Sequence, residues 1–152
     1  MTVQQKPDGY WYGENHADLR QEMTRYSELN GYPIDSFVDV VCTCGNDSFL
    51  FRTDQNEGVA MRFCPQCETE HLMGDIEDYT DEAEVEKHFC VCDAEVFQIT
   101  AGIHRYRNED DSLSADVRWL YLGCRCVDCG LVGSYADWKN EFNGYEELLS
   151  RM

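Results

Sequence analysis

Cysteines are the residues of this chain whose type and spacing indicate chemistry. Eight of the nine lie in four close pairs, and a Cys-x-Cys pair is twice followed by a Cys-x-x-Cys pair. Two thiolate pairs that a fold brings together form a tetrahedral metal site, so this order predicts two four-thiolate sites, most simply with two zinc ions. The predicted ligands are Cys42, Cys44, Cys64 and Cys67 for the first site, and Cys90, Cys92, Cys126 and Cys129 for the second.

Disulfide bonds are the alternative use of so many cysteines. Nine is an odd number, so complete pairing within one chain is impossible. The first residues contain no apolar stretch of the kind found in signal peptides, and nowhere do about 20 apolar residues follow one another, the length that spans a membrane. We therefore expect no membrane association and a reducing, cytoplasmic location, where paired thiols bind metal.

Acidic residues dominate the charge of the chain. The formal net charge is −18, from 30 acidic and 12 basic residues. Nucleic acids are polyanions, and the proteins that bind them concentrate Lys and Arg. The composition therefore favours a basic protein partner over a nucleic acid, although acidity also serves solubility alone.

One amphipathic helix is predicted before the first cysteine. Asn15 or Asp18 is a suitable N-cap, and Gly31 followed by Pro33 ends a helix of about 15 residues. Apolar residues recur at spacings of three and four, which predicts a face that docks on the rest of the chain, with Glu22 on the opposite face. The residues of the apolar face are Leu19, Met23, Tyr26 and Leu29.

Short β-rich runs accompany each cysteine set and predict strands. The strands expected in the first half are 37–41, 48–52 and 59–63, with a turn at 54–58. Those expected in the second half are 95–100 and 117–122, separated by a polar hairpin tip at 108–114.

The two halves correspond at residues other than cysteine. Phe49 and Phe97 each follow the Cys-x-Cys pair by five residues, and Asp75 and Asp137 each follow the last cysteine of their set by eight. Such self-similarity indicates an internal duplication, with a longer hairpin in the second half.

The cysteine pairs, with Gly45 and Gly130 after the second cysteine, resemble the knuckles of the zinc-ribbon (rubredoxin-like) superfamily in motif and layout. The resemblance implies tight turns whose backbone N–H groups point at sulfur and whose glycines adopt positive φ. The chain departs from the family in the single residue between the cysteines of each first pair. It also has Glu68 and Asp93 where glycine is usual.

Together, the resemblance and the duplication predict a small, metal-stabilised, mainly β protein with flanking helices, built from two tandem zinc ribbons. A module of this size has a thin core, and bound metal supplies stability that the core lacks. The expected parts are an N-terminal segment with the amphipathic helix (1–36), a first ribbon (37–76), an acidic linker (77–87), a second ribbon (88–139) and a C-terminal helix (140–152).

The ninth cysteine leaves the ligand set of the second site open. Three cysteines lie close together there, and the alignment with the first half selects Cys126 and Cys129. Cys124 aligns with Arg62, which predicts a free thiol on the approaching strand. The other candidate substitutes for a ligand are His71 and His88.

No catalytic signature accompanies the cysteines. The sequence has no phosphate-binding loop, no His-Glu-x-x-His pair and no deaminase motif, and a complete four-thiolate set leaves no open metal position for water. We expect a protein without enzymatic activity whose acidic surface binds a basic protein partner, as an inhibitor, an immunity protein or an adaptor does. One alternative is a nucleic-acid-binding zinc ribbon that stacks bases on the aromatic and basic residues of 104–107 and 118–119. A rubredoxin-like electron carrier with iron in place of zinc is the other.

Overall fold

An antiparallel sheet of ten strands connects the two halves of the chain in the computed structural model, which describes residues 3–54, 58–73, 85–140 and 142–152. Eight strands follow one another in the order β1-β2-β10-β9-β8-β4-β5-β6, and β3 and β7 pair beside this path with β8 and β4. The strands are β1 Gln4–Gln5, β2 Trp11–Tyr12, β3 Ser36–Asp39, β4 Ser48–Asp54, β5 Val59–Phe63, β6 Glu70–Leu72, β7 Glu86–Lys87, β8 Phe97–Arg107, β9 Leu113–Cys126 and β10 Leu131–Lys139. The helices are α1 His16–Asn30 and α2 Tyr145–Ser150.

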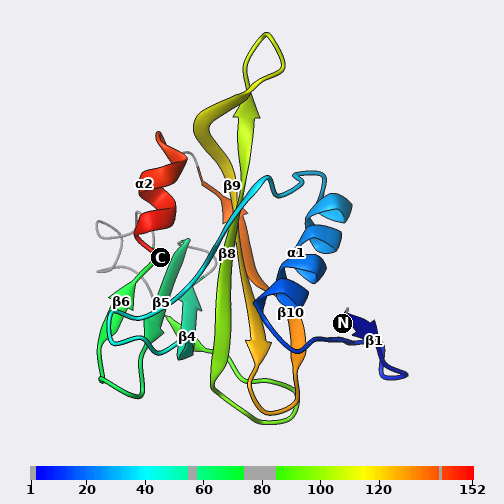
Figure 1. Ribbon diagram of the computed structural model, residues 1–152, viewed down its shortest axis with the longest axis vertical. Helices are drawn as coiled ribbons and strands as arrows, with labels where there is room; N and C mark the ends of the chain where they lie inside the picture. Colours follow the sequence, from blue (N-terminus) through cyan, green and yellow to red (C-terminus); the bar gives the residue numbers. More distant parts are fainter. Residues whose placement is uncertain (1–2, 55–57, 74–84, 141) are drawn as a thin grey trace.

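Strands β8 and β9 form the spine of the molecule, and their hairpin projects beyond the rest of the sheet (Figure 1). Helix α1 packs against β8, β9 and β10, and α2 contacts β8 and β9. The two helices lie to either side of the spine in Figure 1, and the shorter strands β4, β5 and β6 extend it on the side of α2.

Helix α1 begins and ends where local rules place it. The side chain of Asn15 accepts a hydrogen bond from Asp18 N at 3.0 Å and so caps the first turn, as predicted. Gly31 ends the helix in the left-handed conformation at φ 90°, and its N–H donates to Glu28 O.

The face that α1 presents to the sheet differs from the predicted one. Leu29 is 77% exposed, so its predicted place on the apolar face is wrong. The contact face continues instead through Ser27 and Asn30, which hydrogen-bond to the following chain and to a tyrosine hydroxyl of β9. Glu22, expected on the opposite face, is buried because Arg25 pairs with its carboxylate at 2.9 Å.

Leu19 and Met23 supply the apolar contact of α1. Both side chains are fully buried in a cluster with Tyr121 and Val132 of the sheet. Strand β9 has Gly123 beneath Met23, where an added Cβ would lie 2.4 Å from the methionine sulfur. The absence of a side chain at Gly123 therefore allows helix and strand to approach, and each buried apolar side chain stabilises the contact by about 1.5–3 kcal/mol.

The two halves have the same strand order and meet head to head in the sheet. The first half contributes β4, β5 and β6, and the second contributes β8, β9 and β10, with β4 paired to β8 at the join. There Phe49 lies opposite Phe97, and both rings are fully buried. These are the two phenylalanines that the sequence comparison equates, and antiparallel pairing of equivalent residues is what a local two-fold axis produces.

The pairing registers of the halves agree along all three strands. Each pair in β4–β5 and β5–β6 has its counterpart in β8–β9 and β9–β10. For example, the pair Asp54–Val59 corresponds to Gly102–Tyr121, and Leu50–Phe63 corresponds to Gln98–Arg125. On the outer strands, Phe63–Glu70 corresponds to Arg125–Val132.

The strand before each cysteine set crosses to the opposite half. β3 of the first half pairs with β8, placing Val38 opposite Ala101, and β7 of the second half pairs with β4, placing Glu86 opposite Thr53. These two pairs also correspond to each other by position. Of the predicted acidic linker 77–87, residues 77–84 lie outside the described residues, and Glu86–Lys87 form β7 rather than a linker.

The predicted strands are found with different lengths. β5 has the predicted bounds, whereas β3 starts one residue earlier than expected and ends at Asp39. β8 and β9 run much further, because the polar residues of the hairpin continue to pair as far as Arg107 opposite Leu113. β10 was not predicted. The C-terminal helix is confirmed as α2, and Asp75 lies outside the described residues.

Candidate metal centres

The first turn of each cysteine set has the same backbone hydrogen bonds. In the first centre Cys42 N donates to Asn46 O and Gly45 N donates to Cys42 O, each at 2.8 Å. In the second centre the corresponding bonds run from Cys90 N to Ala94 O at 2.8 Å and from Asp93 N to Cys90 O at 2.9 Å. The Cys-x-Cys spacing is therefore compatible with a regular tight turn in both halves.

Positive φ occurs at the turn positions that the zinc-ribbon resemblance implied. Gly45 and Gly130 have φ of 94° and 83°. Asp93 corresponds to Gly45 in the Cys-x-Cys turn of the second centre and has φ of 72°. Glu68 corresponds to Gly130 in the Cys-x-x-Cys turn of the first centre and has φ of 60°. Aspartate and glutamate adopt this region at some cost, so the turns impose the conformation where no glycine supplies it.

The four sulfur atoms of each predicted set lie within 4.8 Å of one another. In the first centre the Sγ atoms are 3.5 Å apart in Cys42–Cys67 and 3.6 Å apart in Cys44–Cys64. In the second centre the distances are 3.5 Å for Cys90–Cys129 and 3.6 Å for Cys92–Cys126.

These distances fit a tetrahedral metal and do not fit disulfides. Four thiolates at about 2.3 Å from a zinc ion are about 3.8 Å from one another, close to the observed separations. A disulfide requires about 2.05 Å between the sulfur atoms. The donor chemistry and the spacing thus suit two metal ions, one at each centre.

Backbone N–H groups point at the sulfur atoms, as the resemblance implied. The N–H of Cys44 lowers the pKa of Cys42, and the N–H of Ala94 lowers that of Cys92. Burial raises the pKa of Cys64, but hydrogen bonds from backbone N–H groups and from Asn46 outweigh it and lower the pKa to about 6. At these three cysteines the turns favour the thiolate form that binds metal. Despite a backbone N–H, contacts with the other sulfur atoms raise the pKa of Cys44 to about 12, and burial raises the pKa of Cys90 and of Cys129.

The ninth cysteine stands apart from both centres. Cys124 lies on β9 and is fully buried, and burial raises its pKa well above the ordinary value. Neither histidine belongs to a sulfur cluster. Nε2 of His88 lies 2.7 Å from Thr53 Oγ1, and Nε2 of His71 lies 2.6 Å from Arg151 O.

A buried cation adjoins the first centre. Arg62 occupies the position that corresponds to Cys124, and its Nε donates to Met152 O at 2.6 Å. Its guanidinium lies over the ring of Phe49 and interacts with Cys42, while burial lowers the pKa of the arginine. Arg62 therefore connects the first centre to the end of the described chain and offsets part of the thiolate charge.

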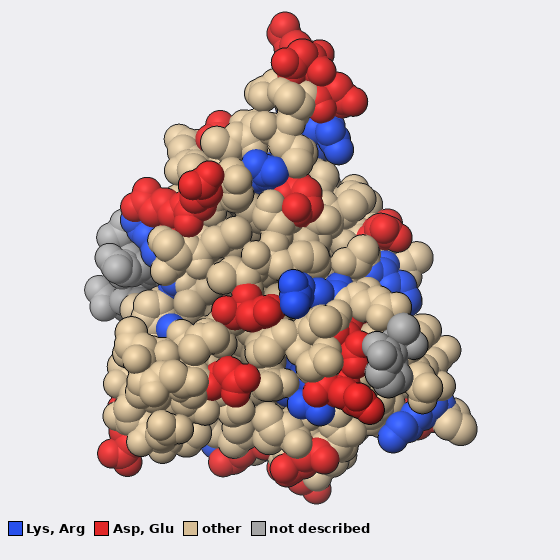
Figure 2. Space-filling view, viewed as in Figure 1, with Lys and Arg blue, Asp and Glu red and all other residues tan. Residues whose placement is uncertain are grey.

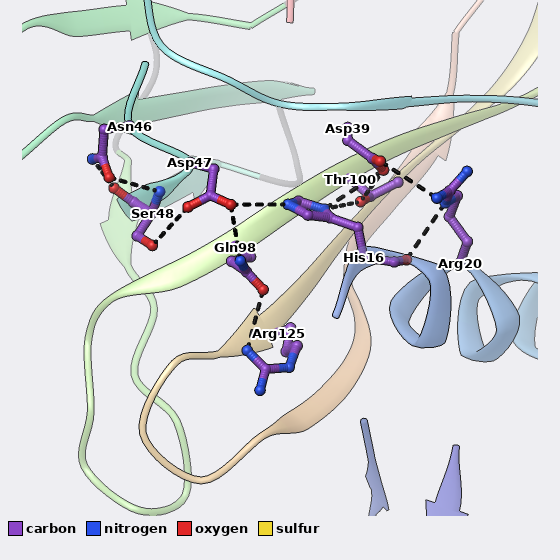
Figure 3. A network of polar contacts seen from close by, with 9 residues as sticks. All are labelled: His16, Arg20, Asp39, Asn46, Asp47, Ser48, Gln98, Thr100 and Arg125. Atoms are coloured by element: carbon purple, nitrogen blue, oxygen red, sulfur yellow. Dashed lines mark hydrogen bonds and ion pairs between the residues drawn. The ribbon is translucent and has the colours of Figure 1, made fainter. Parts of the chain in front are cut away.

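A polar network that sequence reasoning missed joins the first centre to the second half (Figure 3). Asn46 donates from Nδ2 to Cys64 Sγ at 3.3 Å. Its neighbour Asp47 accepts from Gln98 Nε2 at 3.0 Å, and Gln98 Oε1 accepts from Arg125 at 3.1 Å. Arg125 directly precedes Cys126 of the second sulfur cluster, so the network links the two candidate centres.

A second branch of the network reaches helix α1 (Figure 3). His16 Nδ1 lies 2.9 Å from Thr100 Oγ1, and that hydroxyl donates to Asp39 Oδ1 at 2.9 Å. The Thr100 side chain is fully buried, so its hydroxyl is not accessible to a substrate. The branch holds α1 against β3 and β8. Its one sequence signal is a carboxylate, Asp39, within the otherwise apolar run 37–41.

The aromatic and basic residues that suggested base stacking contact one another. The ring of Trp119 stacks on Tyr32 at 4.6 Å between centroids, and Arg118 lies over Tyr32 and Tyr106. Arg105 pairs with Asp35 at 3.0 Å. These contacts cover one face of Trp119 and engage Arg105 and Arg118 within the chain.

Acidic side chains occupy the tip of the β8–β9 hairpin and are spread over the face in Figure 2, between fewer basic ones. Within the described part of the chain, no helix combines the length and apolar character needed to cross a membrane. No protein-family model, curated protein or solved structure matches the chain. The two sulfur clusters are thus the feature that ties it to zinc-ribbon-like motifs.

Proposed function

We propose that the chain is a non-enzymatic zinc protein, built from two duplicated zinc ribbons, whose acidic surface binds a basic protein partner as an inhibitor, an immunity protein or an adaptor does. The observation that carries the proposal is the pair of closed sulfur clusters, each with four thiols within 4.8 Å of one another. Such a set completes the coordination of zinc and leaves no position for substrate or water, which is typical of structural sites.

The matching halves support a duplicated ribbon. The knuckle hydrogen bonds, the pairing registers and the exchange of β3 and β7 correspond between the halves. Each ion is then held by the same arrangement of turns and strands, so the metals are part of the core of the fold. Thiolates also require reducing conditions to stay available for metal, which favours a cytoplasmic location.

The charge distribution supports a basic partner. Two zinc–thiolate centres bring the formal charge of −18 to about −22. Several of the basic side chains already have internal acceptors, including Arg25 with Glu22 and Arg105 with Asp35. The remaining acidic surface attracts a cationic protein over long range and repels nucleic acid.

Affinity purification from native cells, with metal analysis of the same sample, tests the proposal. We expect two zinc ions per chain and a co-purified basic protein that about 0.5 M salt releases, because that concentration screens charges beyond a few ångströms. A metal-free protein, treated with chelator, is the matched control and should retain no partner. Visible absorption from iron, or nuclease-sensitive binding to nucleic acid, would contradict the proposal.

A further inference from the structure

Exposed large apolar side chains concentrate at the second metal centre. Among the described residues six such side chains are exposed, and four of them adjoin a ligand cysteine directly. Three of these four belong to the second centre and are here called the apolar rim: Phe89, Val91 and Val127, which are 59%, 62% and 37% exposed. The two turns that carry these residues meet at one sulfur cluster, and apolar groups that folding leaves in water mark interaction sites.

The fold does not require this apolar rim. The corresponding positions of the first centre are Val41, Thr43 and Pro65, in turns with the same hydrogen bonds. A threonine is therefore compatible with the Cys-x-Cys turn, and yet the second centre has a valine there that is more than half exposed. Packing within the chain therefore does not explain why the middle residue of this turn, Val91, is apolar.

Two acidic side chains flank the apolar rim, and one cation, Lys87, lies 5.5 Å from the ring centroid of Phe89. Asp93 follows the last ligand of the first knuckle, Asp128 lies inside the second knuckle, and both are exposed. The nearby cation Lys87 is paired with Glu95 at 2.8 Å. The four thiolates below the rim add to the negative charge around it.

An open groove adjoins the same centre. It measures about 330 Å³ and is lined by Gln4, Tyr12, Gly13, Glu14 and Cys129. Glu14 is exposed and offers a carboxylate at the groove. A cationic side chain that enters the groove therefore has a carboxylate acceptor.

The geometry points to the apolar rim as the docking site of an amphipathic, cationic protein segment, whose apolar side chains cover Phe89, Val91 and Val127 while its Lys or Arg side chains meet Asp93, Asp128 and Glu14. This rests on the proposed function, since it gives the basic partner a specific place. Apolar contact at the centre of an acidic border is the usual arrangement of a protein interface.

Charge separates this occupant from others. A second copy of the chain would bring two acidic borders together, and each copy carries a formal charge of −18. Nucleic acids and anionic membranes meet the same repulsion. A cationic segment with an apolar face satisfies both features of the surface.

Titration with two synthetic peptides tests the site. The first is an amphipathic helical peptide of about 18 residues made of Leu and Lys, and the second has the same Lys residues with Ser in place of Leu. Affinities are measured by calorimetry on the zinc-loaded protein, and contacts by amide chemical shifts. Variants are Val91→Thr, which copies the first centre, and the triple change with Phe89→Thr and Val127→Thr. The control is Leu29→Thr, a side chain that is 77% exposed on α1.

We expect the Leu-containing peptide to bind about tenfold tighter than the Ser-containing one, with shifts at the three rim residues. The triple change should remove this advantage, whereas the control keeps it, and two zinc ions per chain in every variant confirm that each is folded. Equal binding of both peptides, unaffected by the rim, would overturn the docking site and leave the proposed function in place. Failure of both peptides to bind at low salt would overturn both proposals.

Discussion

Replacement of one ligand at the first centre, Cys64→Ser, tests whether the two halves fold as a unit. The Cys64 sulfur is fully buried and accepts hydrogen bonds from Asn46 and from its own turn. A serine oxygen replaces neither its charge nor its affinity for zinc, so the first ion should be lost. The second centre keeps all four of its cysteines.

The structure predicts that the loss spreads to the second half. A structural zinc contributes about 10–16 kcal/mol to the folding of a small module. That is as large as the whole stability of an ordinary domain, about 5–15 kcal/mol. Because β3 pairs with β8 and β7 with β4, neither half keeps a complete sheet without the other. Even a loss of 5 kcal/mol would lower Tm by about 10–20 °C.

Metal analysis and thermal unfolding followed by circular dichroism measure the outcome. The matched control is Cys124→Ala, which removes a cysteine from the neighbouring strand but no predicted ligand, and should keep two zinc ions. A Cys64→Ser protein that retains one zinc and a folded second half with its own transition would refute the coupling. It would mean that the exchanged strands contribute little to stability.

Three further outcomes follow from the packing. Phe97→Ala should lower the free energy of unfolding in urea by about 3–5 kcal/mol, because the ring is fully buried at the join of the halves. Leu29→Ala should change it by no more than about 0.5 kcal/mol, because Leu29 is exposed. Similar values for both variants would contradict the assigned core. Cys124 should not react with a thiol reagent at pH 8 in the zinc-loaded protein, because burial covers the thiol and raises its pKa. All nine cysteines should react after a strong chelator unfolds the chain. Rapid reaction of one thiol before chelation would count against this. Asp93→Gly should stabilise the protein by about 0.5–1 kcal/mol, since φ of 72° suits glycine. Unchanged or lower stability in urea would show that aspartate adopts this positive φ without an energetic cost.

Features governed by local chemistry were predictable from the sequence. The cysteine spacing indicated both sulfur clusters, because each knuckle is a short turn whose ligands are close along the chain. Asn15 and Gly31 marked the ends of α1 for the same reason, since caps act within a few residues. The comparison equated Phe49 with Phe97, and the structure adds that these two residues pair at the join of the halves.

Features that depend on distant pairing were not predictable in this way. The exchange of β3 and β7 leaves no mark in either strand alone, because it depends on a partner strand in the opposite half. β10 was missed because Gly133, Ser134 and Asp137 interrupt its apolar pattern, and its place is set by register with β9. The wrong place of Leu29 has a similar cause, because polar residues of α1 have hydrogen-bond partners that only the folded sheet provides.

Arg62 and Cys124 make the environments of the two sulfur clusters different, although the strands and turns of the two halves correspond. Both residues occupy the same register position, on the strand that delivers the second knuckle. At the first half a buried cation faces the thiolates and holds Met152, so the C-terminal segment closes that side. At the second half a neutral thiol fills the position, and no cation from this place offsets the charge of the centre. The second centre therefore lacks the buried arginine of the first and carries the apolar rim, and these are the two differences on which the proposed docking site depends.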